Sequence, residues 1–157
     1  MSRRRRSFKR TVEVDPVYRS PLLAKFINKL MKDGKKSLSR RIVYRALENF
    51  AAKVKTDHPL DAFEQALENA KPSLEVKTRR IGGANYQVPV EIPNERRAAM
   101  AMQWVINFSR TKPGTSMVEG LANELSDCFY NQGASIKKKD DTNRMAEANK
   151  AFAHYKW

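Results

Sequence analysis

A chain of 157 residues is long enough to bury one hydrophobic core, and we expect it to fold as a single domain. Its 31 Lys and Arg residues outnumber 17 Asp and Glu residues, so the formal charge of +14 predicts a polyanionic partner; a merely soluble basic protein is the alternative. No apolar run approaches the ~20 residues that span a membrane, and one cysteine excludes an internal disulfide framework and fits a reducing compartment.

The first ten residues form a basic arm with six positive side chains and no negative ones. Like charges at this density repel each other, so we expect the arm to stay disordered until phosphate groups neutralise it. A solvated tail without a role is the alternative. No apolar segment follows the arginines, which argues against a secretory signal. We place the arm at residues 1–15 and a helical domain at 16–157.

The first two predicted helices turn basic faces outward. Ser20 caps the first helix, Pro21 occupies its first turn and Gly34 ends it. Its apolar stripe is Leu23, Phe26, Ile27, Leu30 and Met31, and its basic face is Lys25, Lys29 and Lys32. The second helix covers about 37–54, with Leu38, Ile42, Val43, Ala46, Leu47, Phe50 and Val54 inward and Arg41, Arg45 and Lys55 outward. Because the Lys35-Lys36 link is basic too, this surface predicts contact with phosphate groups.

A third helix, which starts near Pro59 and stops before Pro72, has an acidic outer face. Asp57 is placed to cap its start. Its outward side chains are Asp61, Glu64 and Glu68. We expect this face to turn away from any nucleic acid, which gives the molecule an electrostatic polarity.

A β-hairpin at 74–92 follows, with paired glycines at its turn and arginines beside the turn. Gly82 and Gly83 supply the positive φ of a tight turn, and apolar residues alternate on both arms. A two-residue loop places Arg79 opposite Tyr86, whereas a longer odd loop aligns the apolar faces, and the sequence leaves both registers open. Because an isolated hairpin is marginal in water, this one needs support from helices or a partner.

The fourth helix is expected to be the most buried, because it is apolar nearly all round from 98 to 108. Asn94 is placed to cap it. Arg96 and Arg97 lie unfavourably near the positive end of its dipole. This placement indicates a phosphate contact, with plain surface solvation as the alternative.

The last two predicted helices complete the chain. A capping box of Ser116 and Glu119 starts the fifth, whose apolar stripe includes Cys128 as a core residue and not a nucleophile. The sixth follows Gly133 and has a thin stripe of Met145, Ala148 and Phe152, so we expect it to lie on the surface or to project. Aromatic residues interleaved with Lys at its end can stack on bases, or can simply pin the tail to the body.

Catalytic and metal-binding patterns are missing from the sequence. His58, His154 and one cysteine cannot form a structural zinc set. The paired glycines open a strand and not a helix, so they do not make a phosphate-binding loop. We therefore expect no enzymatic activity, no cofactor and no metal.

Several blocks occur in a specific order along the chain: Asp15-Pro16-Val17-Tyr18, 22–28, Asp33-Gly34-Lys35-Lys36-Ser37, Ile42-Val43-Tyr44 with Ala46-Leu47, 75–91, Leu121-Ala122-Asn123-Glu124-Leu125 and 144–155. They resemble the bacterial-type S-seven family of small-subunit ribosomal proteins, over essentially the whole chain. The resemblance implies a helical domain with an extended hairpin that binds the 3′ major domain of small-subunit rRNA. It also implies nucleation of head assembly and a place beside exit-site tRNA and mRNA.

The basic faces and this resemblance together give two sets of candidate contacts. Candidate rRNA contacts are Arg3, Arg4, Arg5, Arg6, Lys9, Arg10, Lys25, Lys29, Lys35, Lys36, Ser37, Arg41, Arg45, Lys77, Arg79, Arg80, Arg96, Arg97, Ser116 and Met117. Candidates facing tRNA and mRNA are Arg79, Gly82, Gly83, Ala84, Asn85, Tyr86, Arg144, Lys150, His154, Tyr155, Lys156 and Trp157. Further implied partners are neighbouring head and platform ribosomal proteins, on ribosomes of a bacterial cytoplasm or a plastid stroma.

The fourth and fifth helices depart from the family pattern. Gln103 and Gly120 occupy positions where we expect arginine in family members, and Glu119 adds negative charge. We therefore expect less RNA contact along the fifth helix than the resemblance implies.

Two other functional classes are alternatives: a DNA-binding or nucleoid protein with one basic helix in the major groove, and an RNA-modifying enzyme. Against the first, the basic residues are spread over the arm, two helices, the hairpin and the tail. Against the second, no catalytic set is present. We expect a mainly α, single domain of about six helices with one projecting two-stranded β-hairpin.

Overall fold

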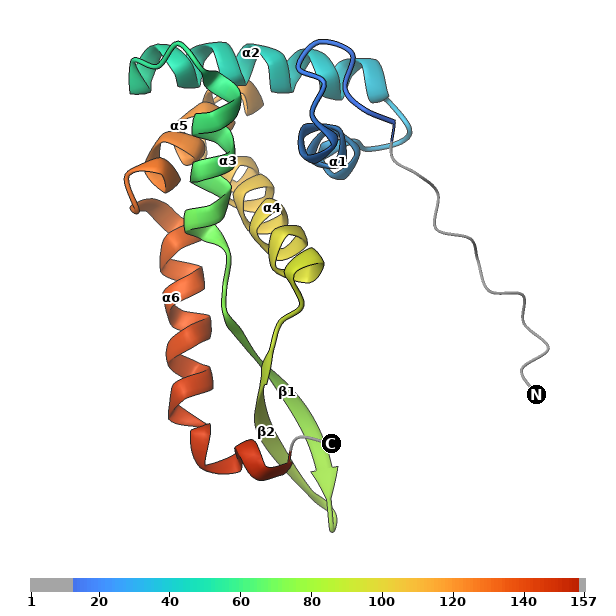
Figure 1. Ribbon diagram of the computed structural model, residues 1–157, viewed down its shortest axis with the longest axis vertical. Helices are drawn as coiled ribbons and strands as arrows, with labels where there is room; N and C mark the ends of the chain where they lie inside the picture. The colour runs from blue at the N-terminus through green and yellow to red at the C-terminus, as the bar shows by residue number, and fades with distance from the viewer. Residues whose placement is uncertain (1–12, 156–157) are drawn as a thin grey trace, which may run out of the picture.

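The computed structural model describes residues 13–155 and contains, within that range, six α-helices, a two-stranded antiparallel hairpin and a short 3₁₀ helix. In chain order these are α1 (Pro21–Leu30), α2 (Lys36–Val54), α3 (Pro59–Ala70), β1 (Leu74–Ile81), β2 (Ala84–Glu91), α4 (Asn94–Thr111), α5 (Met117–Phe129), α6 (Gly133–Ala148) and η1 (Lys150–Tyr155). Helices α1 to α5 gather at one end, while α6 and the hairpin extend from it side by side (Figure 1). The expected mainly helical fold with one projecting hairpin is confirmed.

One hydrophobic core joins α1 to α5 with the start of α6. Its largest fully buried apolar side chains include Phe26, Phe50, Phe63, Leu23, Ile27, Leu47, Leu67, Ile106, Leu121 and Leu125. Helix α5 lies at its centre and contacts α2, α3, α4 and α6. The expectation that α4 is the most buried helix is wrong, because Trp104 and Phe108 are only half-buried. Small residues such as Gly120 and Ala122 allow the neighbouring helices to approach α5 closely.

Helix α1 begins as expected but ends earlier. The Ser20 hydroxyl accepts a hydrogen bond from the amide of Leu23 at 3.3 Å, and Pro21 is the first helical residue. The helix ends at Leu30 and not at Gly34, because Met31 takes an extended ψ of 136°. Asp33 and Gly34 then have φ of 54° and 71° and turn the chain toward α2.

Two predicted helix caps are wrong by one residue. Helix α3 is preceded by His58 and not capped by Asp57, and α4 is preceded by Pro93, so that Asn94 is its first residue. No side chain caps either helix. The Ser116 cap is confirmed, since its Oγ accepts from the amide of Glu119 at 3.3 Å.

The last helix packs by a different face from the one predicted. Its buried residues are Ser135, Ile136, Thr142 and Ala146, whereas Met145 is 49% exposed. The predicted stripe failed because α6 ends at Ala148, and Phe152 belongs to the separate η1 turn. The face that is buried lies against β1. No helix in the part of the chain described has both the length and the apolarity to cross a membrane.

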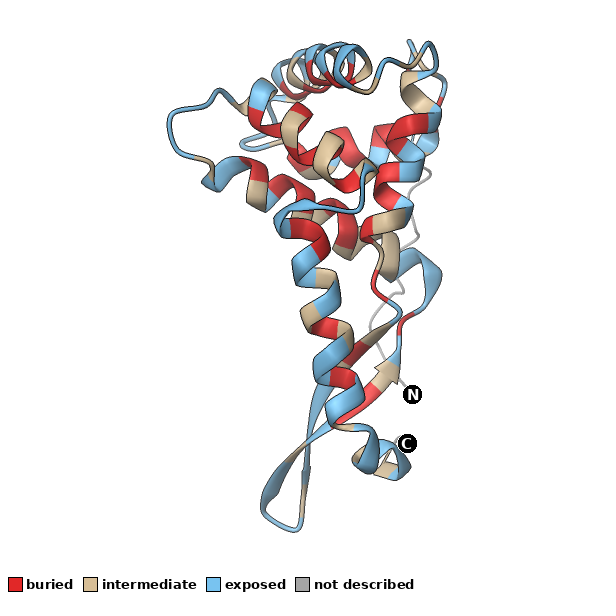
Figure 2. Cartoon of the chain, turned by 90° about the vertical axis from the view of Figure 1, so that its left-hand side faces the viewer, coloured by how far each residue is buried: buried red, intermediate tan, exposed pale blue. Residues whose placement is uncertain are grey.

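Strands β1 and β2 with their loop, residues 74–91, form what we call the finger. Ile81 pairs with Ala84 and Arg79 with Tyr86, so the loop is the two-residue one. Gly82 and Gly83 have φ of 57° and 89°, as a type I′ turn requires. Figure 2 shows that buried residues concentrate in the helical body, whereas the outer finger is largely exposed.

Candidate nucleic-acid interface

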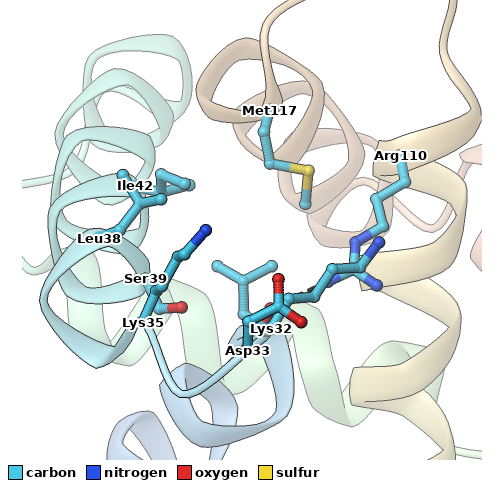
Figure 3. A pocket seen from close by; sticks show the side chains of 9 residues that line it. Lys32, Asp33, Lys35, Leu38, Ser39, Ile42, Arg110 and Met117 are labelled. Carbon is cyan, nitrogen blue, oxygen red and sulfur yellow. Dashed lines mark hydrogen bonds between the residues drawn. The ribbon is translucent and has the colours of Figure 1, made fainter.

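A cleft of about 500 Å³ opens where the α1–α2 turn, the start of α2, the end of α4 and the start of α5 meet (Figure 3). It is lined by Leu30, Lys32, Asp33, Lys35, Leu38, Ser39, Ile42, Arg110 and Met117. Apolar side chains form part of its wall, and cations outnumber the single carboxylate. Leu38, expected in the core, lies here and is 47% exposed, which corrects that expectation. The cleft therefore joins two candidate RNA contacts that are far apart in sequence, Lys35 and Met117.

The start of α2 beside this cleft is open to an anion. Lys35 precedes the helix, and no side chain accepts a hydrogen bond from its first amides. Lys35 and Ser37 are exposed, while Lys36 is half-buried and lies 3.8 Å from the Glu13 carboxylate. The partial positive charge of a helix start favours phosphate groups, and the two lysines add to it.

The basic faces of α1 and α2 are only partly available to solvent. Lys25, Arg41 and Arg45 are exposed. Lys29, by contrast, donates to the backbone oxygen of Ala99, and burial lowers its pKa. Of these four candidates, Lys29 is thus already engaged in packing α1 against α4.

The finger presents most of its candidate contacts on its outer half. Lys77 lies 3.2 Å from Glu75, and both arginines beside the turn are exposed. Gly82, Gly83, Ala84 and Asn85 at the tip are exposed as well. Tyr86 differs, because it is half-buried against Phe152 and Tyr155 of η1.

Arg96 and Arg97 have intramolecular partners that the sequence analysis missed. Arg96 donates to Glu75 from Nε at 3.0 and 3.1 Å and from Nη2 at 2.8 Å. These bonds hold the pKa of the Glu75 carboxyl below its usual value, against the effect of burial. Arg97 donates from Nε to the Pro72 oxygen at 2.8 Å. Arg96 thus fastens β1 to α4, and Arg97 fastens the segment just before β1. The only sequence signal was a glutamate on the strand.

The remaining candidates lie at the start of α5, along α6 and at the chain ends. Arg144, Lys150 and His154 are exposed, and Tyr155 is half-buried. Ser116 is exposed at the start of α5. The following candidates lie outside the residues that the structure describes: Arg3, Arg4, Arg5, Arg6, Lys9, Arg10, Lys156 and Trp157.

Gly120 is buried against α4. A Cβ at this position would lie 2.7 Å from the backbone oxygen of Ser109. Gln103 is half-buried and donates to Asn107 at 2.8 Å. The close packing of α5 against α4 therefore accounts for a glycine at position 120.

Two buried carboxylates that the sequence analysis did not single out organise the body. Asp15 accepts from the Tyr44 hydroxyl at 2.6 Å and from the amide of Tyr18 at 3.0 Å. Burial and this hydrogen bond raise the pKa of Tyr44 to about 12. Glu124, fully buried, accepts from Ser135 N and Oγ at 2.9 and 2.8 Å. Asp15 thus fixes the segment that leads into α1, and Glu124 fixes the start of α6.

Neither a metal set nor an activated nucleophile occurs among the described residues. Within residues 13–155, no three His, Cys, Asp or Glu side chains are grouped to hold a metal ion. Burial, with a further contribution from Glu124, raises the pKa of the Cys128 thiol to about 12. A thiol in this environment packs the core and is unreactive.

A family model described as ribosomal protein S7p/S5e matches residues 2–150. The chain belongs to this ribosomal protein family. It is 67% identical to the small ribosomal subunit protein uS7 of Protochlamydia amoebophila (strain UWE25), over 157 residues and the full length of both chains. The proteins of the same name from Chlamydia felis (strain Fe/C-56) and Chlamydia abortus (strain DSM 27085 / S26/3) are 64% and 63% identical, again over the full length of both chains.

Membership in the S7p/S5e family makes the chain a structural, RNA-binding ribosomal protein that acts in translation. Members of this family are structural components and not enzymes. The expected class is therefore confirmed, and the family relationship removes the nucleoid-protein and RNA-modifying alternatives.

Proposed function

We propose that the chain binds the 3′ major domain of small-subunit rRNA, nucleates assembly of the head, and contacts exit-site tRNA and mRNA through the finger and η1. One observation carries the rRNA part: the cleft that brings Lys35 at the start of α2 together with Met117 at the start of α5. The relatives, which carry the name small ribosomal subunit protein uS7, support the same assignment.

The cleft suits RNA because it combines cations with apolar side chains. Lys32, Lys35 and the uncapped start of α2 favour phosphate groups. Leu38 and Met117 offer apolar surface to an unstacked base, which is how proteins usually read irregular RNA. Duplex DNA offers no such base, so the surface favours structured RNA.

The rest of the proposal follows the distribution of charge. Residues 1–15 act as an RNA-binding arm that starts from the Asp15 anchor, and residues 16–157 act as one domain. The acidic, exposed face of α3, with Asp61, Glu64 and Glu68, turns away from RNA. Neighbouring head and platform ribosomal proteins cover other surfaces, and the relatives from Chlamydia species support a bacterial cytoplasm over a plastid stroma.

Filter binding of the full chain to a transcript of the 3′ major domain tests the rRNA assignment. If about six to ten phosphate groups are contacted, affinity falls ~10³–10⁵-fold between 50 and 200 mM salt. A duplex DNA of the same length serves as the competitor. A flat salt response, or a preference for the duplex DNA, would contradict the proposal.

A further inference from the structure

The outer half of the finger has little support of its own. Residues 77–80 of β1 are all exposed, and so are Ala84, Asn85 and Gln87 on β2. A two-stranded ribbon without a buried face is marginal in water, and its Gly-Gly turn adds freedom. Something other than strand pairing must therefore fix the tip.

The root of the finger, by contrast, is held by several polar contacts with the body. Asn143 Oδ1 of α6 accepts from Ser73 Oγ at 3.1 Å and from Ser73 N at 3.3 Å. The Glu75–Arg96 pair ties β1 to α4. These contacts set the direction in which the finger leaves the body, but a ribbon fixed only at its root can still bend toward its tip.

A cluster of three aromatic rings supports the outer half from the side. Tyr86 lies 5.5 Å from Phe152 and 5.3 Å from Tyr155, at interplanar angles of 60° and 44°. Phe152 and Tyr155 are stacked, at 6.5 Å and 17°. These separations and tilts lie in the favourable range for aromatic pairs. We call the three rings the aromatic brace.

The aromatic brace connects the finger to a second fixed point on the body. The turn η1 contacts β2 and α6. Helix α6 is itself anchored by Glu124, which accepts two hydrogen bonds from Ser135, and by the face it packs on β1. Finger, α6 and η1 thus form a closed triangle, visible in Figure 1.

We propose that Tyr86, Phe152 and Tyr155 are positioning residues, which hold the tip of the finger at a fixed place relative to the body. Tyr86 pairs with Arg79 across the hairpin, so fixing its ring fixes the strand segment from which Arg79 and Arg80 emerge. A tip that is already ordered loses less conformational freedom when it binds. The consequence for RNA rests on the proposed function, whereas the brace itself does not.

Hydrogen–deuterium exchange of the full chain tests the brace without RNA. In Phe152→Ala with Tyr155→Ala, amides of residues 77–81 and 84–88 should exchange about tenfold faster, while those of α1 to α5 stay unchanged. Tyr155→Phe keeps the ring and should exchange like the wild type. Met145→Ala is the control, because Met145 is exposed on α6 and outside the brace. Unchanged exchange in the finger, or equal acceleration throughout the helical body, would overturn the proposal.

Directed cleavage in reconstituted small subunits tests the consequence for RNA. An iron chelate on Ala84→Cys at the tip should cut a narrow set of nucleotides, and removing the brace should spread the cuts and weaken the strongest about tenfold. Cys128 needs no replacement, because it is buried. Narrow cleavage without the brace would overturn the positioning role. If the intact chain gives no cleavage or does not join the subunit, the proposed function fails, and the exchange result alone decides on the brace.

Discussion

At the scale of single residues, Glu75 is the carboxylate that joins the finger to the helical body. It is 7% exposed and is bound by Arg96 and Lys77. A buried carboxylate in such a position contributes to stability only while it is ionised and paired. The finger's attachment should therefore depend on pH.

We predict that Glu75→Gln lowers the free energy of unfolding more at pH 7 than near pH 3. The Arg96 hydrogen bonds hold the folded-state pKa of Glu75 below its ordinary value of 4.5, although burial opposes this. A lowered pKa contributes stability that is complete above the unfolded value and is lost as the pH falls through the folded value. Urea unfolding at both pH values measures the difference. Glu64→Gln on exposed α3 is the control, and an equal effect of Glu75→Gln at both pH values would contradict the prediction.

Residue partners were the least predictable part of the site. Arg96 lies in the first turn of α4, where its charge was interpreted as a phosphate contact, yet it pairs with Glu75 of β1. The two residues meet because the hairpin folds back on itself and brings β1 beside the start of α4. Helical periodicity cannot predict a contact between residues on two different elements. Similarly, the contact of Tyr86 with Phe152 depends on where η1 turns.

At the scale of elements, the crossing of α5 over α4 depends on one glycine. We predict that Gly120→Ala destabilises the protein by up to about 2 kcal/mol, because overpacking costs about 1–3 kcal/mol and a helix-propensity gain of about 1 kcal/mol offsets only part of it. The added Cβ would lie 2.7 Å from Ser109 O, which is backbone and cannot rotate away.

Urea unfolding of Gly120→Ala measures this effect, with Lys137→Ala on α6 as the surface control. Lys137 is exposed, so its replacement should change stability by no more than about 0.5 kcal/mol. A gain in stability on Gly120→Ala would contradict the prediction. It would show that α4 can move to accommodate the added methyl group and that a glycine is not needed at this contact.

The finger's charge allows a second prediction at this scale. We predict that Arg79→Ala with Arg80→Ala weakens binding of tRNA to reconstituted small subunits about tenfold, through lost phosphate contacts, while circular dichroism stays unchanged. Both side chains are exposed on β1 and outside the core.

Lys137→Ala with Lys138→Ala removes the same charge from exposed positions of α6 and is the control for the finger variant. Equal weakening by both variants would show that only total charge matters. Loss of helical signal on changing the two arginines would show that they are structural.

The helix starts capped by serine and most of the core faces were predictable, whereas the end of α1 and the buried face of α6 were not. Ser20 and Ser116 accept hydrogen bonds from amides only three residues further along the chain, so the sequence alone predicts the helix starts that they cap. Leu38 and Met145 also match an apolar period, yet both are exposed, because α2 and α6 each face neighbours that periodicity cannot specify. The tight hairpin turn was predictable from its glycines, whereas its register had to be observed.

At the scale of the whole molecule, the excess positive charge and the cleft account for different properties of RNA binding. A formal charge of +14 explains attraction to RNA at a distance but not where RNA is held. The cleft joins segments that sequence reasoning treated separately, because α2 and α5 pack side by side. The effect of contacts in the cleft on RNA binding should therefore be measurable separately from the effect of the protein's overall charge.

We therefore predict that Lys35→Gln with Lys36→Gln makes the dependence of log K on log salt less steep by about 1–2 units for binding to the 3′ major domain transcript. Each lysine that meets a phosphate group releases about one condensed cation, so losing two contacts lowers the slope by that amount. Lys71→Gln removes a charge at the end of α3, where Lys71 pairs with Glu68, and should leave the slope unchanged. If Lys71→Gln lowers the slope per charge as much as Lys35→Gln with Lys36→Gln does, the protein holds RNA by its overall charge, and the start of α2 is not a specific phosphate site.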